Sequence, residues 1–286
     1  MDRLKRFAVV VGENKDIGFE HTRVIVEKLL HHEIEVFLSP EVQESLGLGT
    51  VKSEPICEGA DFVICVGGDG TFLKAARKAF TLDKPVLGIN RGTVGFLAEV
   101  ETSEIDQAIT RVLAGKYTIE PRMVLHAEVI RDGKRVYQGY AINDAVVTRA
   151  TISRVLRLRI NVDGKFVDSF GGDGVIISSP TGSTGYTLAA GGPIVQPDMR
   201  LILVSPICPH ILYSRTFVVS DSKNVSVSIV SDENVDAMIT LDGQEGFPIR
   251  PNDLVNIRAA ENSVSFVSVK DLNFYDVLRA KIRSGN

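Results

Sequence analysis

The first 115 residues alternate between short apolar runs and longer amphipathic stretches. Four short runs are rich in β-branched and aromatic residues, as buried strands are: 6–12, 34–39, 62–66 and 85–90. Three other stretches carry apolar residues at helical spacing: 19–32, 71–80 and 103–113. Strands that alternate with helices of this length favour a parallel sheet covered by helices. The sequence therefore predicts a parallel α/β domain over residues 1–115.

The last helix of this domain carries signals at both of its ends. Ser103 and Asp106 have the S-x-x-D spacing of a capping pair, and Gly115 stands at the usual stop position. We therefore expect this helix to begin at Ser103 and to end before Gly115.

Beyond Gly115 helical periodicity gives way to strands rich in Val, Ile and Thr. Asp-Gly pairs lie between strand-like runs at three places, 132–133, 163–164 and 242–243, which is the short-range signal of a hairpin. This pattern predicts an antiparallel β domain over residues 116–270. Residues 274–283 return to a helical pattern, and we expect the segment 271–286 to rejoin the first domain.

Composition and charge exclude several classes of protein. The 32 Lys and Arg residues are slightly outnumbered by 36 Asp and Glu residues, so the chain has no basic excess with which to hold nucleic acid. No apolar run is long enough to cross a bilayer, and we expect no membrane partner. The three cysteines, Cys57, Cys65 and Cys208, show no paired spacing, which favours a reducing cytoplasm.

The segment Gly67-Gly68-Asp69-Gly70-Thr71 follows a predicted strand and opens a predicted helix. Glycines at this edge of a parallel sheet let backbone N–H groups approach a phosphate. A carboxylate repels phosphate, so phosphate binding does not explain Asp69. Phosphoryl-transfer enzymes use such an Asp to orient the attacking hydroxyl. A tight turn with an exposed Asp fits the pattern equally well. The chain contains no P-loop and no G-x-G-x-x-G fingerprint here.

A second glycine-rich segment runs from Gly171 to Gly192. It holds seven glycines and six Ser or Thr residues, and apolar runs flank it. Small residues expose backbone donors and acceptors at close range, and Tyr186 adds an aromatic face, so a nucleotide is a suitable ligand. The alternative is a flexible surface loop.

Asn143 and Asp144 interrupt the apolar run 140–147. Because strand side chains alternate between faces, one of two neighbouring polar residues points into the core unless a bulge turns it away or a ligand contacts it. The pair offers donors and acceptors suited to ribose hydroxyls. A bulge with local backbone hydrogen bonds is the alternative.

Taken in order, these motifs resemble the NAD kinase family. GGDGT at 67–71, GINRGTVGFLAEV at 88–100 and NDAVVTR at 143–149 are similar to its conserved segments, and so are SPICPH at 205–210 and DGQ at 242–244. The most specific match is GGDGVIISSPTGSTGYTLAAGGPIV at 171–195. The chain departs from the family pattern at Asp144, where Glu is usual, at Gly185, where Ala is common, and at Ala189, where Ser is frequent.

The resemblance implies a fold and a reaction. The fold is a Rossmann-like parallel α/β domain, then an antiparallel β-sandwich-like domain, with a C-terminal helix returning to the first domain. The reaction transfers the γ-phosphoryl group of ATP to the 2′-hydroxyl of the adenosine ribose of NAD, with Mg²⁺ as the divalent ion. The resemblance also implies a homodimer or a homotetramer.

The resemblance further assigns site residues. Asp69 is the catalytic residue, and Gly67, Gly68, Gly70 and Lys74 line its cradle. The dinucleotide site is assigned to Asn143, Asp144, Arg154, Gly171, Asp173, Thr184, Gly185, Tyr186, Thr187, Leu188, Ala189 and Gln244.

Two other functions stay open on the sequence. A lipid or sugar kinase shares the GGDGT motif but needs a different acceptor pocket. A dinucleotide-binding sensor without turnover keeps the binding motifs but does not need the Asp69 carboxylate. The sequence does not choose between ATP and polyphosphate as donor, or between NAD and NADH as acceptor.

Overall fold

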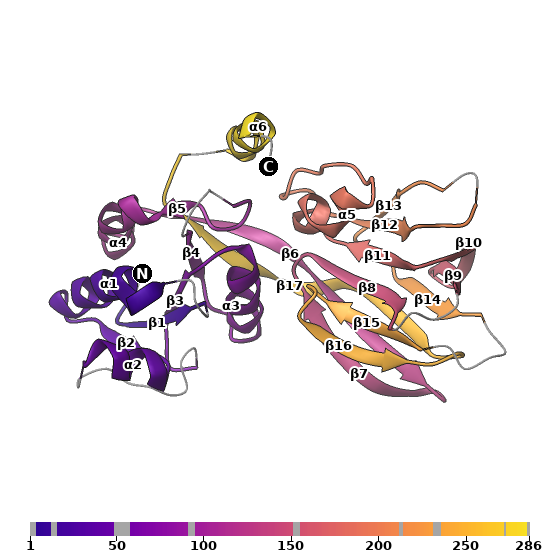
Figure 1. Cartoon of the computed structure of the whole chain (residues 1–286), viewed down its shortest axis with the longest axis horizontal. Helices are drawn as coiled ribbons and strands as arrows, with labels where there is room; N and C mark the ends of the chain where they lie inside the picture. The colour runs from indigo at the N-terminus through magenta and orange to yellow at the C-terminus, as the bar shows by residue number, and fades with distance from the viewer. Residues whose placement is uncertain are drawn as a thin grey trace. The chain divides into compact units, whose positions relative to one another are not determined.

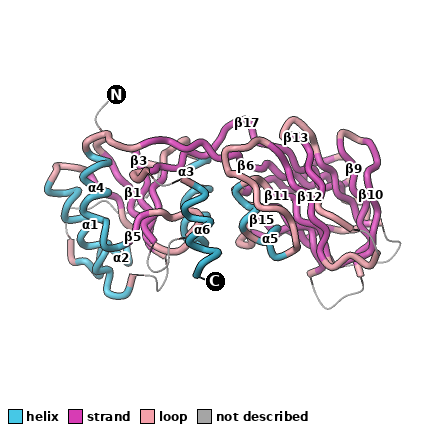
Figure 2. Tube along the Cα trace, turned by 90° about the horizontal axis from the view of Figure 1, so that it is seen from above, coloured by secondary structure: helices cyan, strands magenta, loops and turns pink. Residues whose placement is uncertain are grey.

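The computed structural model describes residues 4–12, 16–48, 58–90, 95–150, 155–211, 214–230, 236–271 and 273–284. The chain divides into two compact units: unit 1, Met1–Pro121 with Val264–Asn286, and unit 2, Arg122–Ser263. Helices are concentrated in unit 1, whereas unit 2 consists mainly of strands (Figure 2). Two long strands, β6 (Thr118–Arg131) and β17 (Leu254–Ser268), contribute residues to both units.

Unit 1 is built on a parallel sheet. Its strands are β1 (Arg6–Val11), β2 (Glu35–Phe37), β3 (Phe62–Val66), β4 (Val86–Asn90) and β5 (Val100–Glu101). Its helices are α1 (Glu20–His31), α2 (Pro40–Leu46), α3 (Asp69–Thr81), α4 (Ile105–Leu113) and α6 (Phe274–Ser284), with single 3-10 turns at Ile17–Phe19 and Thr102–Glu104. The strand order is β2-β1-β3-β4, and β4 also pairs in parallel with β5 and β17. The predicted parallel α/β architecture is therefore confirmed.

Helices cover both faces of this sheet (Figure 1). Phe7 and Val9 of β1 join one buried cluster with Leu29 of α1 and Ile109 of α4. Because strand side chains alternate between faces, this cluster marks the face that α1 and α4 cover.

On the other face, α3 approaches β4 where Gly88 leaves room for it. A Cβ on Gly88 would lie 2.7 Å from the Phe72 ring and 2.8 Å from the Ala98 Cα. The Phe72 ring in turn meets Phe266 of β17 edge-to-face, at 4.8 Å between centroids. Gly88 and Phe72 thus fix the axis of the helix that begins at Asp69.

Two features of unit 1 differ from the sequence-based expectations. Helix α2 is additional: Ser39 accepts a hydrogen bond from the Val42 N–H, Pro40 opens the helix, and Gly47 closes it at a φ of 65°. The predicted S-x-x-D cap at Ser103 is wrong. Glu101 and Glu104 form the capping box instead, and α4 begins only at Ile105.

Unit 2 consists of two packed antiparallel sheets. The first has the strand order β13-β12-β11-β8-β15-β16, and the second joins β10, β9, β14 and β17 to the β6–β7 pair. The bounds are β7 (Lys134–Ala141), β8 (Asp144–Arg149), β9 (Leu156–Val162), β10 (Lys165–Gly172), β11 (Gly174–Ser178), β12 (Leu201–Ile207), β13 (Phe217–Ser220), β14 (Val225–Ile229), β15 (Ala237–Leu241) and β16 (Glu245–Ile249). Two short helical segments follow β11: η3 (Thr181–Thr184) and α5 (Tyr186–Ala189). One apolar core draws residues from both sheets, which makes the unit a sandwich.

All three Asp-Gly pairs close hairpins, as predicted. They connect β6 to β7, β9 to β10 and β15 to β16. Asp132, Asp163 and Asp242 have φ values of 50°, 49° and 51°, and the glycine after each is also left-handed. Two successive left-handed residues match the right-handed twist of the flanking strands.

The C-terminal helix is present as α6 and groups with unit 1. The fold class implied by the resemblance is thereby confirmed in its three parts: a parallel α/β sheet, an antiparallel sandwich and a C-terminal helix. No helix among the described residues is long and apolar enough to span a bilayer.

Candidate active site

Asp69 occupies the first position of α3, directly after the turn that leaves β3. Gly68 is the N-cap residue, and the Phe72 N–H donates to its carbonyl at 3.0 Å. The Gly67 N–H donates to the Ile89 carbonyl at 2.9 Å, which fastens the turn to β4. A Cβ on Gly67 would lie 2.8 Å from the Thr71 side chain, so the turn requires glycine there.

The two carboxylate oxygens of Asp69 have different surroundings. Oδ2 accepts a hydrogen bond from the Phe96 N–H at 3.2 Å. Oδ1 is buried and has no hydrogen-bond partner among the described residues. A buried acceptor without a partner is unfavourable in an empty site, so Oδ1 is available to a hydroxyl or another donor on a ligand.

Space is open beside the start of α3. A Cβ on Gly68 or on Gly70 would meet no other atom within 4 Å. Lys74 is exposed on the same helix, five residues beyond Asp69. The structure thus places the predicted cradle residues around the start of α3, within unit 1.

In unit 2, Asn143 and Asp144 lie at the junction between β7 and β8. The prediction that they interrupt a single strand is wrong, because β7 ends at Ala141 and β8 begins at Asp144. The Asn143 carbonyl accepts from the Ser179 N–H at 2.9 Å and from the Ser178 hydroxyl at 3.1 Å. Its side-chain Oδ1 is buried and has no partner among the described residues.

Asp144 is a buried carboxyl, with only 5% of its surface exposed. Burial raises its pKa to about 7, and the negative charge of Asp242 acts in the same direction. Both effects disfavour the carboxylate form, so Asp144 titrates near neutral pH.

A pocket of about 310 Å³ opens beside these residues. Its lining consists of Asn143, Asp144, Val146, Thr148, Tyr186, Thr240, Asp242 and Gly243. Burial raises the pKa of Tyr186, with smaller contributions from Cys208, Asp173 and Asp144, so the hydroxyl stays protonated at neutral pH. The pocket thus combines an aromatic ring with convergent amide and carboxyl groups, which is the usual make-up of a small-molecule site.

The glycine-rich segment 171–192 is structured, and the flexible-loop alternative is wrong. It forms the end of β10, then β11, η3 and α5. Several of its glycines are required by backbone packing: a Cβ on Gly174 would lie 2.4 Å from the Val147 carbonyl, and one on Gly182 would lie 2.2 Å from the Asn143 carbonyl. At both positions the packing of neighbouring backbone is by itself enough to require glycine.

Other members of the segment lie close to the pocket residues. A Cβ on Gly185 would approach Asn143 Nδ2 at 3.5 Å and Asp144 Oδ2 at 3.9 Å. Thr187 is fully buried, and its hydroxyl oxygen has no partner among the described residues. Tyr186, Leu188 and Ala189 are exposed, whereas Thr184 is half-buried.

The remaining predicted residues lie outside the lining of this pocket. Asp173 pairs with Arg149 at 3.2 Å, and the Gly171 carbonyl accepts from the His210 N–H at 2.7 Å. Gln244 is exposed in the β15–β16 turn, next to the lining residue Gly243. Arg154 lies outside the described residues.

Sequence reasoning missed four groups. Two of them, Gly95 and the Phe96 N–H, hold the Asp69 carboxylate. The third is Asp242, which holds the Asn143–Asp144 backbone. The fourth is Thr181, whose buried hydroxyl in η3 has no partner among the described residues. Gly95 and Asp242 stand inside segments that carry the family resemblance, so a signal was present. The contacts themselves are tertiary and are not encoded in local spacing.

Comparison with known proteins agrees with both units. The model of the ATP-NAD kinase N-terminal domain matches residues 7–117, and that of the ATP-NAD kinase C-terminal domain matches residues 142–269. The NAD kinase of Acetivibrio thermocellus is 38% identical over 279 residues, which covers 97% of this chain and 96% of the relative. The NAD kinase of Ruminiclostridium cellulolyticum is 40% identical over 281 residues, covering 98% of each chain.

Solved structures give the same result. A crystal structure of an NAD kinase from Archaeoglobus fulgidus in complex with ATP aligns with a TM-score of 0.73 and 27% identity, covering 98% of this chain and 99% of that one. Yeast NADH kinase complexed with NADH shares the fold, with a TM-score of 0.89 at 22% identity, over 99% of this chain and 88% of that one. Family models match both halves of the chain, and relatives align with it over nearly its whole length. The chain therefore belongs to the NAD kinase family.

Proposed function

We propose that the chain transfers the γ-phosphoryl group of ATP to the 2′-hydroxyl of the adenosine ribose of NAD and so makes NADP. Family membership supports this reaction. The structural observation that carries it is the Asp69 carboxylate, with one oxygen held by the Phe96 N–H and the other buried and unpartnered.

Asp69 is the group proposed to receive the proton of the reaction. A ribose hydroxyl is a weak nucleophile, and phosphoryl transfer depends mainly on positioning and on electrostatic stabilisation. As the ribose oxygen bonds to the γ-phosphorus, the bond from that phosphorus to the bridging oxygen breaks and ADP leaves. The hydroxyl proton passes to Oδ1 while Oδ2 remains on the Phe96 N–H, so the carboxylate keeps its orientation.

The open start of α3 is proposed to receive ATP phosphate. Space is free over Gly68 and Gly70, and α3 is 13 residues long, so its N-terminal N–H groups favour an anion. Lys74 is exposed on the same helix and adds a positive charge that can reach a phosphate oxygen. Gly67 keeps the turn tight, because a Cβ there would meet the Thr71 side chain.

Mg²⁺ is proposed to enter as part of the ATP complex. The described residues contain no group of three or more His, Cys, Asp or Glu side chains that could hold an ion. When bound, Mg²⁺ would be held mainly by phosphate oxygens, as is usual for this ion, and would neutralise part of the triphosphate charge.

The unit 2 pocket is proposed to bind the dinucleotide. Asn143 and Asp144 offer an amide and a carboxyl to ribose hydroxyls, and Tyr186 offers a ring face to a flat base. Thr187 and Thr181 each bury a hydroxyl that has no partner among the described residues. Such hydroxyls are available to form hydrogen bonds with a bound ligand. Gly171, Asp173, Arg154 and Gln244 are assigned to this site by the resemblance alone.

The oligomeric state and the cellular location are part of the same proposal. A homodimer or homotetramer is supported by β10, an edge strand with Phe166 and Val167 exposed. A cytoplasmic location is supported by Cys208, an exposed free thiol. Light scattering during size-exclusion chromatography measures the oligomer directly.

The decisive experiment mixes purified protein with NAD, ATP and Mg²⁺ and detects NADP with an NADP-specific dehydrogenase. Asp69→Asn is expected to abolish NADP formation while NAD binding persists. The matched control is Asp83→Asn, an exposed Asp just beyond the other end of α3, which should leave the rate unchanged. A fully active Asp69→Asn variant would remove Asp69 from the chemistry. Absence of NADP in the wild type would redirect the search to polyphosphate, and then to lipid or sugar acceptors.

A further inference from the structure

Three backbone groups converge on the carboxylate of Asp242. The N–H groups of Ile142, Asn143 and Asp144 donate to it at 3.0, 2.7 and 3.2 Å, respectively. The Asp242 N–H donates in return to the Asp144 carbonyl at 2.9 Å. One side chain in the β15–β16 turn therefore fixes the backbone of the β7–β8 junction, about 100 positions away in the sequence.

The same carboxylate supplies the charge that acts on Asp144. Both residues line the pocket, and none of its lining residues in the described part of the chain is a Lys or an Arg. Tyr186 of α5 is the other titratable group in the lining, and its raised pKa leaves it uncharged at neutral pH. Further along β8, Arg149 is already paired with Asp173. Among the described lining residues, Asp144 thus shares the pocket with the Asp242 carboxylate and with no Lys or Arg.

We propose that Asp242 is a positioning residue of the dinucleotide site, which fixes the Asn143–Asp144 backbone and, through its charge, disfavours ionisation of the nearby Asp144 carboxyl. A protonated Asp144 donates a hydrogen bond through its hydroxyl, whereas an ionised Asp144 only accepts. Burial and the charge on Asp242 together favour the donating form of Asp144. The part that concerns the dinucleotide rests on the proposed function; the proton on Asp144 does not.

Two substitutions of Asp242 test its effect on the Asp144 carboxyl. Asp242→Asn removes the charge and keeps an acceptor oxygen, whereas Asp242→Glu keeps the charge on a longer side chain. A neighbouring charge typically shifts a carboxyl pKa by about one unit or more. The Asp144 titration midpoint is therefore expected near 7 in the wild type, about one pH unit lower in Asp242→Asn, and close to the wild-type value in Asp242→Glu.

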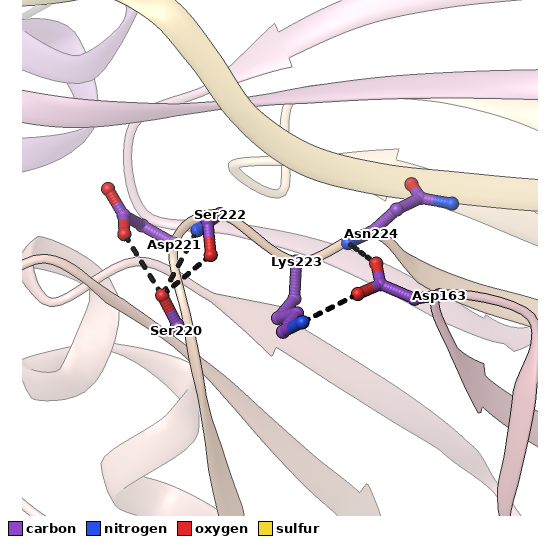
Figure 3. A network of polar contacts seen from close by, with 6 residues as sticks. All are labelled: Asp163, Ser220, Asp221, Ser222, Lys223 and Asn224. Atoms are coloured by element: carbon purple, nitrogen blue, oxygen red, sulfur yellow. Dashed lines mark hydrogen bonds and ion pairs between the residues drawn. The ribbon is translucent and has the colours of Figure 1, made fainter.

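The chain offers a matched control at Asp163. This residue stands in the same kind of Asp-Gly turn, with a φ of 49°, and its carboxylate accepts from the Asn224 N–H at 3.0 Å and from Lys223 Nζ at 2.8 Å (Figure 3). Asp163 does not line the pocket. Asp163→Asn is therefore expected to leave the Asp144 midpoint unchanged.

The measurement is a ¹³C NMR titration of aspartate carboxyl groups in the ligand-free protein, with the Asp144 signal assigned by its loss in Asp144→Asn. A wild-type midpoint near 4, or equal midpoints in Asp242→Asn and Asp163→Asn, would overturn the proposal. A wild-type midpoint near 4 would overturn the proposal even if Asp242→Asn does not fold.

Calorimetric titration with NAD tests the positioning task. Asp242→Asn is expected to weaken NAD binding about tenfold or more, because an amide NH₂ replaces one acceptor oxygen against the three N–H groups. Asp163→Asn should bind NAD like the wild type, and equal affinities in the two variants would refute positioning. A wild type that does not bind NAD would contradict the proposed function, while the Asp144 titration would still decide on the proton.

Discussion

Gly95 lies directly against the Asp69 carboxylate: a Cβ built on Gly95 would stand 2.0 Å from Asp69 Oδ1 and 2.7 Å from its Cγ. The next residue, Phe96, donates its N–H to the other oxygen. The backbone of 95–96 therefore restrains both oxygens of this carboxylate, one by close contact and the other by a hydrogen bond.

Gly95→Ala is expected to displace the Asp69 side chain and to lower NADP formation about 100-fold, the typical cost of moving a catalytic group by about 1 Å. The NADP assay measures the loss, and the melting temperature reports the fold. The contrasting variant is Gly246→Ala, whose Cβ would be crowded by the flexible end of Met238, at 2.6 Å, and would otherwise have ordinary contact distances. Its activity should match the wild type. A Gly95→Ala enzyme with full activity would show that the Asp69 position is not critical.

Thr187→Val should separate stability from binding. The Thr187 hydroxyl is buried without a partner among the described residues, so replacing it with a methyl group removes an unsatisfied polar group and should raise stability by about 1 kcal/mol. NAD binding is expected to weaken about tenfold, because the ligand loses a hydrogen bond. Thr22→Val is the control: the Thr22 hydroxyl donates to Asp16 at 2.6 Å, and its loss should destabilise the protein. Urea unfolding and calorimetry measure the two effects, and unchanged NAD affinity in Thr187→Val would exclude this hydroxyl from the site.

Tyr186 presents an exposed ring at the pocket, with 47% of its surface accessible. If a flat ring of the dinucleotide stacks on it, Tyr186→Ala should weaken NAD binding about 10- to 100-fold. Tyr186→Phe keeps the ring and should bind nearly as well as the wild type. Equal losses in the two variants would assign the contribution to the hydroxyl rather than to the ring.

The pH dependence of stability should carry the signature of Asp144. Folding raises its pKa from 3.8 to about 7, so within this window the folded protein holds a proton that the unfolded chain has released. Stability is therefore expected to fall as the pH rises from about 4 to about 7, by at most about 4 kcal/mol from this residue.

Asp144→Asn supplies the comparison for this effect. The variant should unfold at higher urea concentration than the wild type at pH 8, and the difference should shrink toward pH 4. Burial also raises the pKa of Glu99, but Glu99 is present in both proteins, so the difference between them isolates Asp144. A pH-independent difference would contradict the raised pKa.

Local signals were sufficient for the elements that carry the phosphate cradle. The run 62–66 has no polar break, and two glycines end it, so β3 and the start of α3 follow from the sequence. The three Asp-Gly hairpins follow for the same reason, because left-handed backbone at two successive positions is a local requirement. The start of α4 was misplaced because two capping patterns overlap there and the Glu101–Glu104 pair prevails.

The restraints on the site residues could not be predicted in the same way. Asp242 acts on residues about 100 positions away, and Gly95 meets a carboxylate 26 positions earlier. Each of these contacts depends on strand order and on backbone separation, which emerge only when the sheet is assembled. The break between β7 and β8 also escaped local reasoning, because the apolar residues on either side of Asn143 read as one continuous strand.

The close packing at Gly174 and Gly182 has a consequence for mutational scanning. At both positions a side chain of any size would collide with main-chain carbonyl oxygens, whatever ligand is present. A saturation library scored on NADP production alone would mark these sites as intolerant, just like true ligand contacts. Scoring the same library for abundance separates the two classes, since variants at Gly174 and Gly182 should vanish from the folded pool, whereas Tyr186→Ala should persist there with reduced activity.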